Sequence, residues 1–574
     1  MHVAKIPNRG SRPTYLLRTS YREGGKVKTR TLGNISDLPD EQIGLISAVL
    51  KGEKLVPSTD TRGLKITDSK PCGHIAAVLG TMDAVGFERL LQYEDCRERR
   101  LIAALAAGRL LRPQSKAATL DALRGGTLAE LRRRLDLDKV RRREIYEALD
   151  WLLQRQNRIE KKLAKKHLHE ETLLFYDLTS TYMEGEKCPL AAFGYSRDHR
   201  SDKKQINIGL LCNREGVPIS VQVFPGNTAD PATVAAQVRK IKQRFKVGRV
   251  AVVADRGMLT SARLREDIAP AGLDHITALR APQLKELAED ESLQPELFDE
   301  TELCEIESDR YPGERLVACR NPFLTEERRR KRDELLQAAE KKLQAIQDAV
   351  ERKKRPLRGR EKIAERVGRF KEKSKVSKHF RIEYSDDTFR FERNEPTIRR
   401  EAALDGIYVI RTSLQTTELS PEQTVGAYKN LRVVESAFRC LKRTTMQIRP
   451  VYHHLEDRVK AHVFLCMLAY YVEHHMRRAL RPLLFAEDDP ESAAADRANP
   501  VAPARKSAAA KSKAAIRKNA DGDPLHTFPG LLDNLATLCV NTVKIGPHAA
   551  FRCATDATPL QQKAFNYLGV PTPT

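Results

Sequence analysis

The sequence predicts an α/β protein whose core is a mixed β-sheet with helices on its faces. Three observations predict it. From residue 172 onward, short strand-like runs alternate with helical runs in the order β-β-β-α-β-α-β. Between about residues 73 and 168, apolar residues recur instead at helical spacing. Between about residues 283 and 405, an insertion with helical and strand patterns of its own interrupts the core.

Two regions precede the core. Residues 14–33 alternate and turn at Glu23-Gly24-Gly25, which predicts a small basic β-hairpin; a helix begins at Asp40, and residues 1–65 form a first domain. Residues 66–168 are expected to be mostly helical, with Thr127 capping one helix. Arginines cluster there at positions 132–134 and 141–143. They fit short helices that dock on duplex DNA, and they also fit the solvated face of a helical bundle.

The core, residues 169–480, contains two apolar strands that end in aspartate. The first runs from 173 to Asp177 and is followed by a hairpin near 206–210 and 219–223. Asp230-Pro231 begins a helix, with the aspartate as N-cap. The second strand runs from 250 to Asp255, and a helix near 261–268 and a strand near 275–279 follow.

The insertion at about 283–405 predicts a helical hairpin followed by β-structure. A 3-4-3-4 apolar seam from Leu336 to Val350 predicts one charged helix, residues 356–359 break it, and a second helix follows. A β-hairpin is expected around Ser385-Asp386-Asp387, and a strand at 407–410 returns the chain to the core. Residues 487–524, poor in large apolar side chains, are expected to be a disordered basic linker to a small C-terminal element at 525–574.

The net charge indicates the class of partner. The 574 residues include 101 Lys and Arg against 77 Asp and Glu, a formal net charge of +24. Nucleic acid is the polyanion that such a surplus favours, with a ribosomal or membrane-surface partner as the alternative. The ten cysteines form no C-x-x-C pair, the first residues lack an apolar signal core, and the longest apolar helix core, near 461–472, is too short for a bilayer. We expect a soluble intracellular protein without a membrane partner.

Asp177, Asp255 and Glu435 are the candidate catalytic residues and metal ligands. A carboxylate at the end of a buried strand is costly unless a cation or hydrogen bonds stabilise it. Mg²⁺ prefers carboxylate oxygens and water, and a pair of divalent ions can promote phosphodiester cleavage. A strand-end aspartate alone is weak evidence, because such residues often cap loops. Two of them on strands that a mixed sheet brings together are stronger evidence.

The helix around Glu435 adds basic residues to the carboxylates. Leu431, Val434, Phe438 and Leu441 form its predicted buried stripe. Arg432, Glu435, Arg439 and Lys442 follow the same spacing about 100° around the helix, so Arg439 and Lys442 could reach a phosphate backbone. The alternative is an exposed helix stabilised by pairs between Glu435 and its arginines.

The chain resembles the DDE transposases of bacterial insertion sequences, in the branch with a Y-R-E-K signature. The blocks that carry the resemblance are FYDLTSTY, GYSRDHRSDKKQ, FPGNTAD, VVADRGM, DGIYVIRTS and ESAFRCLK followed by RPVYHHLEDRVKAH, between about residues 170 and 475. Asp177, Asp255 and Glu435 match the family's metal-binding triad, and Tyr428, Glu435 and Lys442 match the Y, E and K. The arginine departs from the signature, because its position holds Leu431 and Arg432 follows one residue later. Arg432 is the candidate for the DNA-phosphate contact that the resemblance implies for this arginine.

The resemblance implies an RNase H-like core and a transposase. Such an enzyme would cut DNA at terminal inverted repeats with two Mg²⁺ ions, Mn²⁺ being an alternative, and transfer the freed 3′ ends into target DNA. It would act as a DNA-bridged homodimer in the bacterial cytoplasm, associated with the nucleoid. A metal-dependent nuclease without strand transfer and a non-catalytic DNA-binding protein are the alternatives.

Three further residues are candidates for DNA contacts. Arg200 and Lys203 could hold a strand near Asp177, although a basic hairpin loop would look the same. Tyr428 could stack on an unpaired base, or it could simply be half-buried at the start of its helix.

Overall fold

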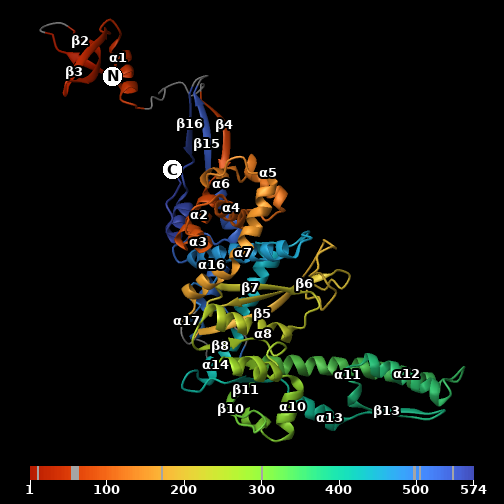
Figure 1. Ribbon diagram of the computed structural model, residues 1–574. Helices are drawn as coiled ribbons and strands as arrows, with labels where there is room; N and C mark the ends of the chain where they lie inside the picture. The colour runs from red at the N-terminus through yellow and green to blue at the C-terminus, as the bar shows by residue number, and fades with distance from the viewer. Residues whose placement is uncertain are drawn as a thin grey trace. The chain divides into compact units, whose positions relative to one another are not determined.

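The computed structural model describes residues 1–8, 12–53, 64–169, 172–298, 301–490, 492–495, 500–502, 506–545 and 549–573 (Figure 1). The chain divides into two compact units. The first comprises Met1–Ser69 and Val540–Ala554, and the second comprises Lys70–Cys539 and Thr555–Thr574.

The first unit contains two small antiparallel sheets. The predicted hairpin is present: β2 (Thr14–Glu23) pairs with β3 (Lys26–Asn34), and β1 (His2–Ile6) adds a third strand. Helix α1 (Asp40–Leu50) follows, with Asp40 and Glu41 in its first turn, where the helix dipole favours acidic side chains. The second sheet has the order β16-β15-β4, formed by β4 (Leu64–Pro71), β15 (Cys539–Ile545) and β16 (Ala549–Ala554). The expected C-terminal element therefore contributes strands to this unit.

The region from 73 to 168 is helical, as predicted. Its helices are α2 (Gly73–Ala84), α3 (Phe87–Leu91), α4 (Arg97–Leu111), α5 (Lys116–Arg124), α6 (Ala129–Arg134) and α7 (Arg142–His167). Three of them, α2, α4 and α7, pack against the buried helix α16 (Glu456–Ala479), which also packs on strand β7 (Pro218–Pro225) of the central sheet. The predicted cap at Thr127 is wrong: α6 starts after Leu128 without a side-chain cap, and the Thr127 hydroxyl instead accepts a hydrogen bond from Arg112.

An eight-stranded mixed sheet forms the core, in the order β10-β11-β14-β9-β8-β5-β6-β7. Its strands are β5 (Thr172–Tyr182), β6 (Gln205–Cys212), β7 (Pro218–Pro225), β8 (Val250–Val253), β9 (Asp274–Ala278), β10 (Leu303–Ile306), β11 (Arg315–Arg320) and β14 (Ile407–Thr412). Strands β5, β8 and β9 are parallel neighbours. Strand β14 is antiparallel to both β9 and β11, so β11 runs in the same direction as β5, β8 and β9.

Short helices connect the strands and cover the sheet. They are η2 (Asp230–Thr233), α8 (Val234–Arg239), η3 (Lys240–Phe245), α9 (Ser261–Arg263), η4 (Leu264–Ile268), η5 (Ala269–Ala271), α10 (Ala281–Glu289), α14 (Pro421–Lys429), α15 (Arg432–Arg439) and η8 (Cys440–Thr444). Asp230 is not the predicted N-cap. Ala229 takes that place, and the Asp230 carboxylate accepts a hydrogen bond from Arg197 at 2.6 Å.

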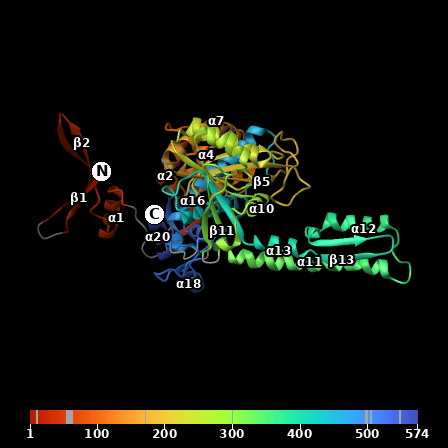
Figure 2. The same ribbon diagram turned by 90° about the horizontal axis from the view of Figure 1, so that it is seen from below.

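The insertion is shorter than predicted, because β10 and β11 lie within residues 283–405 and yet belong to the central sheet. The part that leaves the core is an arm, residues 322–403. It consists of α11 (Pro322–Glu351), α12 (Arg360–Lys373), η7 (Ser377–His379), β12 (Phe380–Tyr384), β13 (Phe389–Arg393) and α13 (Glu395–Ala403). The predicted helical hairpin and β-hairpin are therefore confirmed. Figure 2 shows α11, α12 and β13 side by side, extending away from the sheet.

The C-terminal residues of the second unit pack on its helices. Helix α19 (Phe528–Ala536) lies against α2, and α20 (Pro559–Leu568) contacts α2 and α16. The range 487–524, expected to be disordered, differs where it is described: it contains α17 (Ser492–Ala495) and α18 (Ala508–Ile516), and Val501 is fully buried. Lys429 ties this range to α14 by hydrogen bonds to the carbonyls of Pro500, Val501 and Ala502. No helix in the described ranges is long and apolar enough to cross a membrane.

Candidate active site

The two strand aspartates meet because their strands are parallel neighbours. Phe175 of β5 lies opposite Val253 of β8, so Asp177 and Asp255, each two residues further on, lie at the same level of the sheet. Asp177 is still within β5, which continues to Tyr182, whereas Asp255 follows the end of β8. This difference explains why Asp177 is partly buried and Asp255 is exposed.

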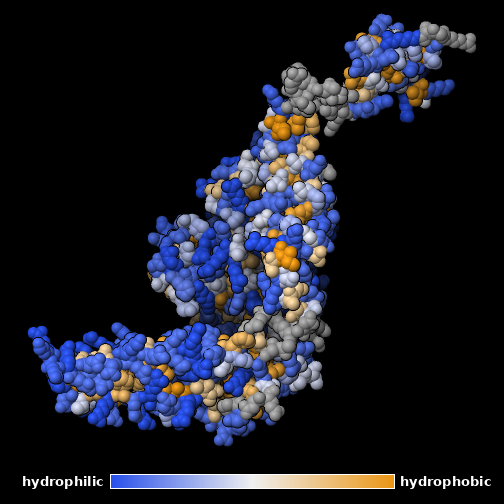
Figure 3. Space-filling view, turned by 180° about the vertical axis from the view of Figure 1, so that it is seen from behind, coloured by the Kyte–Doolittle hydropathy of each residue, from blue (hydrophilic) through white to orange (hydrophobic). Residues whose placement is uncertain are grey.

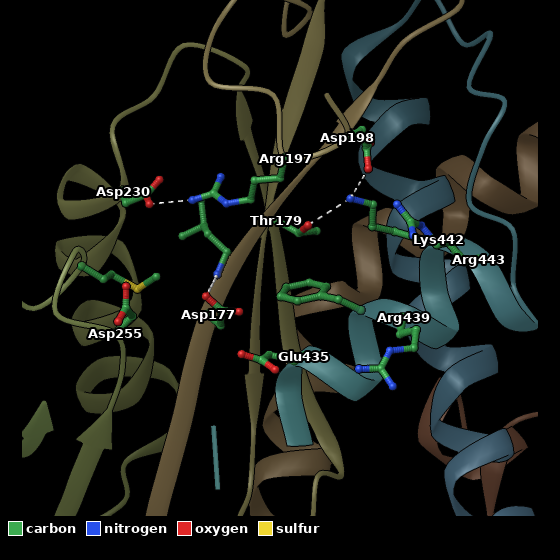
Figure 4. Close-up of a pocket in the computed structure, with 13 residues that line it drawn as sticks. Asp177, Thr179, Arg197, Asp198, Asp230, Asp255, Glu435, Arg439, Lys442 and Arg443 are labelled. Atoms are coloured by element: carbon green, nitrogen blue, oxygen red, sulfur yellow. Dashed lines mark hydrogen bonds and ion pairs between the residues drawn. The ribbon is translucent and has the colours of Figure 1, made fainter. Parts of the chain in front are cut away.

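The third carboxylate comes from α15, which packs across β5 and β6. The predicted stripe is largely confirmed, since Val434, Phe438 and Leu441 are buried and Leu431 is only partly covered. Glu435 is exposed and faces a cavity of about 380 Å³ that Asp177 and Asp255 also line. Figure 4 shows Asp177, Asp255 and Glu435 around this opening. Side chains separated by 78 and 180 residues of sequence are thus gathered in one place.

The environment of Asp177 disfavours its charged form. Burial raises the pKa of Asp177 to about 7, and the nearby charges of Glu435 and Asp255 also raise it. A hydrogen bond from the Leu178 backbone N–H, at 2.7 Å, and the charge of Arg197 oppose this shift. A carboxyl group with such a pKa beside two other acids would be stabilised in its charged form by a bound cation.

The donor set suits hard divalent cations, because it consists of carboxylate oxygens without sulfur or imidazole. Among the described residues, no three His, Cys, Asp or Glu side chains are close enough together to hold one ion jointly. The three acids line the same cavity without meeting at a single point. This arrangement fits ions that are each held by fewer than three of the acids.

Basic residues line the other side of the cavity. They are Arg439, Lys442 and Arg443. The DNA contacts expected of Arg439 and Lys442 stay a prediction. Arg439 and Arg443 are exposed, and neither forms an ion pair with a described residue. Lys442 is already engaged: its Nζ donates to Thr179 at 3.2 Å and to the Ser180 carbonyl at 2.7 Å, and it lies 2.6 Å from Asp198. Burial lowers the pKa of Lys442, and the charge of Asp198 opposes that effect.

The other predicted DNA contacts lie outside the cavity. Arg432 is the first residue of α15 and lines a separate cavity, beside Val433. Arg200 pairs with Asp202 and Lys203 pairs with Glu184. Tyr428 is half-buried, and its hydroxyl donates a hydrogen bond to Asp255 at 3.3 Å.

Sequence reasoning missed Arg197, Asp198 and Asp230 as residues of this site. Arg197 donates to Asp230 at 2.6 Å across the cavity rim (Figure 4). Asp198 is 2% exposed and lies 3.1 Å from Arg449 in addition to its contact with Lys442. A signal was present, since the blocks GYSRDHRSDKKQ and FPGNTAD contain all three residues. Their local patterns, a polar loop and a helix start, gave no sign of contact with residues 442 and 449.

Comparison with known families decides the class. Residues 168–472, more than half of the chain, match the model of the transposase DDE domain. The chain belongs to the DDE transposases. In addition, residues 2–59 match the N-terminal domain of IS1634 family transposases. No curated protein matches the chain in sequence.

Several expectations are thereby confirmed. The protein is an insertion-sequence DDE transposase, an enzyme of DNA transposition that cleaves DNA and transfers strands, and its mixed sheet is consistent with the RNase H-like core of that family. DDE transposases bind DNA and generally depend on divalent metal ions. Membership of the Y-R-E-K branch stays a prediction.

Proposed function

We propose that this DDE transposase cuts DNA at the terminal inverted repeats of its own element, with Asp177, Asp255 and Glu435 as the catalytic, metal-binding carboxylates. One observation carries the assignment: three acids from β5, the end of β8 and α15 line a single cavity at one edge of the sheet. Structural salt bridges do not account for them, because none of the three forms an ion pair within the described part of the chain.

The three carboxylates would hold two Mg²⁺ ions, or Mn²⁺ in their place. Such ions activate the attacking oxygen and neutralise the charge that develops on the phosphate. The chain's own residues orient the substrate. Tyr428 holds the Asp255 carboxylate through its hydroxyl, and Leu178 fixes the Asp177 carboxylate through its backbone N–H. Arg439 and Arg443, which line the same cavity, would bind the phosphates that flank the scissile bond.

Recognition of the terminal repeats is assigned to the helical region before residue 168, and the protein is proposed to act as a homodimer on DNA. The first arginine cluster is largely used within the fold, since Arg133 and Arg134 pair with the buried Glu130. The second cluster is exposed: Arg141, Arg142 and Arg143 lie at the start of α7. We therefore expect Arg141–Arg143 to contribute more to DNA binding than residues 132–134.

A strand-transfer assay tests the assignment of the carboxylates. Pre-cleaved terminal-repeat DNA is incubated with supercoiled plasmid and Mg²⁺, and joined products are counted for the wild type and for Asp177→Asn, Asp255→Asn and Glu435→Gln. Each variant should lose at least about 100-fold in joining while binding the repeat DNA as before. Asp202→Asn is the matched control, because Asp202 is an exposed acid in the same loop region and does not line the cavity. Joining by a triad variant at the wild-type rate would refute the assignment.

A further inference from the structure

The arm, residues 322–403, has a hydrophobic core of its own. Its two helices and its β-hairpin enclose Leu343, Ile363, Phe370, Phe380 and Phe389, all buried. Because these contacts lie within the arm, its fold does not depend on a neighbouring surface. Figure 3 shows that the face of the arm seen there is mostly hydrophilic. The arm is thus an ordered structure whose surface carries charge instead of an apolar interface.

The charge is concentrated at one end of the arm. Residues 322–350, on α11, carry seven basic and six acidic side chains, which nearly balance. Residues 352–362 form the far tip, between α11 and α12, and carry seven basic side chains and one acidic one. All seven of these basic residues are exposed, namely Arg352, Lys353, Lys354, Arg355, Arg358, Arg360 and Lys362.

The tip is held in one conformation. The Gly359 N–H donates to the carbonyl of Asp386 at 2.8 Å, in the turn of the β12–β13 hairpin. The Arg358 guanidinium donates to the carbonyls of Val350 and Asp387, at 2.9 and 3.0 Å. Arg358 therefore binds backbone, while Lys353, Lys354 and Lys362 form no ion pair with a described residue. Seven positive charges within eleven residues repel one another, and a polyanion would relieve that repulsion.

The root of the arm lies at the catalytic edge of the sheet. Strand β11 runs parallel to β5 and β8, so its C-terminal end lies on the same side as Asp177 and Asp255. Helix α11 begins directly there, at Pro322. Its 30 residues span about 45 Å at 1.5 Å per residue, which equals roughly 13 base pairs of duplex at 3.4 Å each.

We propose that the basic tip, residues 352–362, is a second DNA-binding surface that holds the phosphate backbone of duplex DNA irrespective of its sequence. Arginine and lysine make up its charge, and such side chains bind phosphates without reading bases unless they enter a groove. The tip adds phosphate contacts at a distance from the cavity, and it does so on an ordered loop, so little ordering free energy is lost on binding.

Salt-dependent binding tests the proposal. The full chain is titrated against a fluorescent duplex of unrelated sequence and about 40 base pairs, without divalent metal, at several salt concentrations between about 50 and 200 mM. The triple variant Lys353→Gln, Lys354→Gln, Lys362→Gln should bind about tenfold more weakly or worse, and the slope of log K against log salt should flatten by about 2 to 3.

Two further variants separate the tip from general charge. Lys331→Gln, Lys341→Gln, Lys342→Gln removes the same charge from exposed positions on α11 and should keep the wild-type slope. Changing the three tip lysines to arginine keeps their charge, so this variant should also show the wild-type slope of log K against log salt. An unchanged slope in the tip triple, or an equal loss in the tip and α11 triples, would overturn the proposal. The proposal would also be overturned if the tip triple changed the mass of the protein in sedimentation experiments but left its affinity for DNA unchanged. That result would indicate that the tip binds a second copy of the chain instead of DNA.

Discussion

At the scale of single residues, the fold controls the protonation of Asp177, because burial raises its pKa to about 7. It is the only member of the proposed triad that lies within a strand, where it pairs with Leu210 of β6, and it is partly buried while Asp255 and Glu435 are exposed. Placing three acids around one cavity costs free energy in the absence of a cation. Such repulsion is common in active sites. A bound cation relieves it, and the free energy released adds to the affinity for the cation.

Binding of Mg²⁺ should therefore depend on pH. With a pKa of about 7, the Asp177 carboxyl is largely protonated below neutral pH and charged above it. Because a metal ligand must be deprotonated, affinity should rise from about pH 6 to about pH 8, with release of a proton near the lower end. Isothermal titration calorimetry in two buffers of different ionisation enthalpy measures both effects. Asp177→Asn should abolish the proton release, and an affinity that is flat over this range would argue against Asp177 as a ligand.

The same shift has a consequence for stability. The pKa of Asp177 is raised from 3.8 in the unfolded chain to about 7 in the folded protein. The contribution of Asp177 to the free energy of unfolding is therefore present at low pH and is lost as the pH rises between these two values. Without divalent metal, Asp177→Asn should stabilise the protein at about pH 8, on the order of 1–3 kcal/mol. Urea unfolding in the presence of a chelator measures this difference in the free energy of unfolding between variant and wild type. The stabilisation by Asp177→Asn should be smaller at about pH 4 than at about pH 8.

Asp198 should matter for stability where neighbouring acids do not. It is 2% exposed between Lys442 and Arg449, so Asp198→Ala leaves two largely covered cations without their partner. We expect a loss of about 3 kcal/mol or more in the free energy of unfolding. Asp202→Ala, which removes only the exposed partner of Arg200, should cost less than about 1 kcal/mol. Equal effects of the two changes would show that the Asp198 network contributes no more than a surface ion pair.

At the scale of elements, the polar cluster around Glu314 joins three strands of the sheet. Glu314 precedes β11, accepts two hydrogen bonds from Arg411 of β14 at 2.6 and 2.5 Å, and lies 3.4 Å from His275 of β9. Burial raises the pKa of Glu314, but the hydrogen bonds and charge of Arg411, together with the nearby His275 ring, outweigh burial and lower that pKa to about 2. The cluster ties the start of β11 to β14 and β9, at the opposite end of β11 from the arm, which begins at Pro322.

This cluster predicts acid sensitivity. The depressed pKa means that the stabilisation by Glu314 is fully present above the unfolded value of 4.5 and is lost as pH falls toward 2. Glu314→Gln should therefore lower the free energy of unfolding by about 2–3 kcal/mol at about pH 7. The difference from the wild type should narrow below about pH 4, as unfolding curves at several pH values can show. A constant difference would place the effect outside the ionisation of Glu314.

Elements with strong local patterns could be predicted from the sequence, and elements defined by distant pairing could not. The apolar seam of α11 and the aspartate-ending strands are visible in short windows. Strands β10 and β11 have only four and six residues. Strand β11 joins the sheet by pairing with β14, about 90 residues later in the chain, and β10 joins only through β11. The start of η2 was misjudged for a related reason, since Arg197 draws the Asp230 carboxylate away from a capping position.

At the scale of the whole molecule, the topology of the central sheet connects the proposed site to the arm. Parallel strands place Asp177, Asp255 and the start of α11 at one edge, although they are far apart in sequence. That Asp177, Asp255 and Glu435 come together at one cavity could be predicted, because each has a recognisable sequence context. The positions of Arg432, Asp198 and Arg197 depend on how α15 and the loop at 196–204 pack, which no local pattern encodes.

Crystals of the protein with a terminal-repeat DNA end, grown with Mn²⁺, test the central claim most directly. The anomalous scattering of Mn²⁺ locates the ions without any assumption about which residues bind them. The account predicts two Mn²⁺ peaks in the cavity, each within coordination distance of at least one of Asp177, Asp255 and Glu435, with all three carboxylates used. Peaks that avoid these side chains, or a Glu435 that remains unligated beside a bound DNA end, would contradict it.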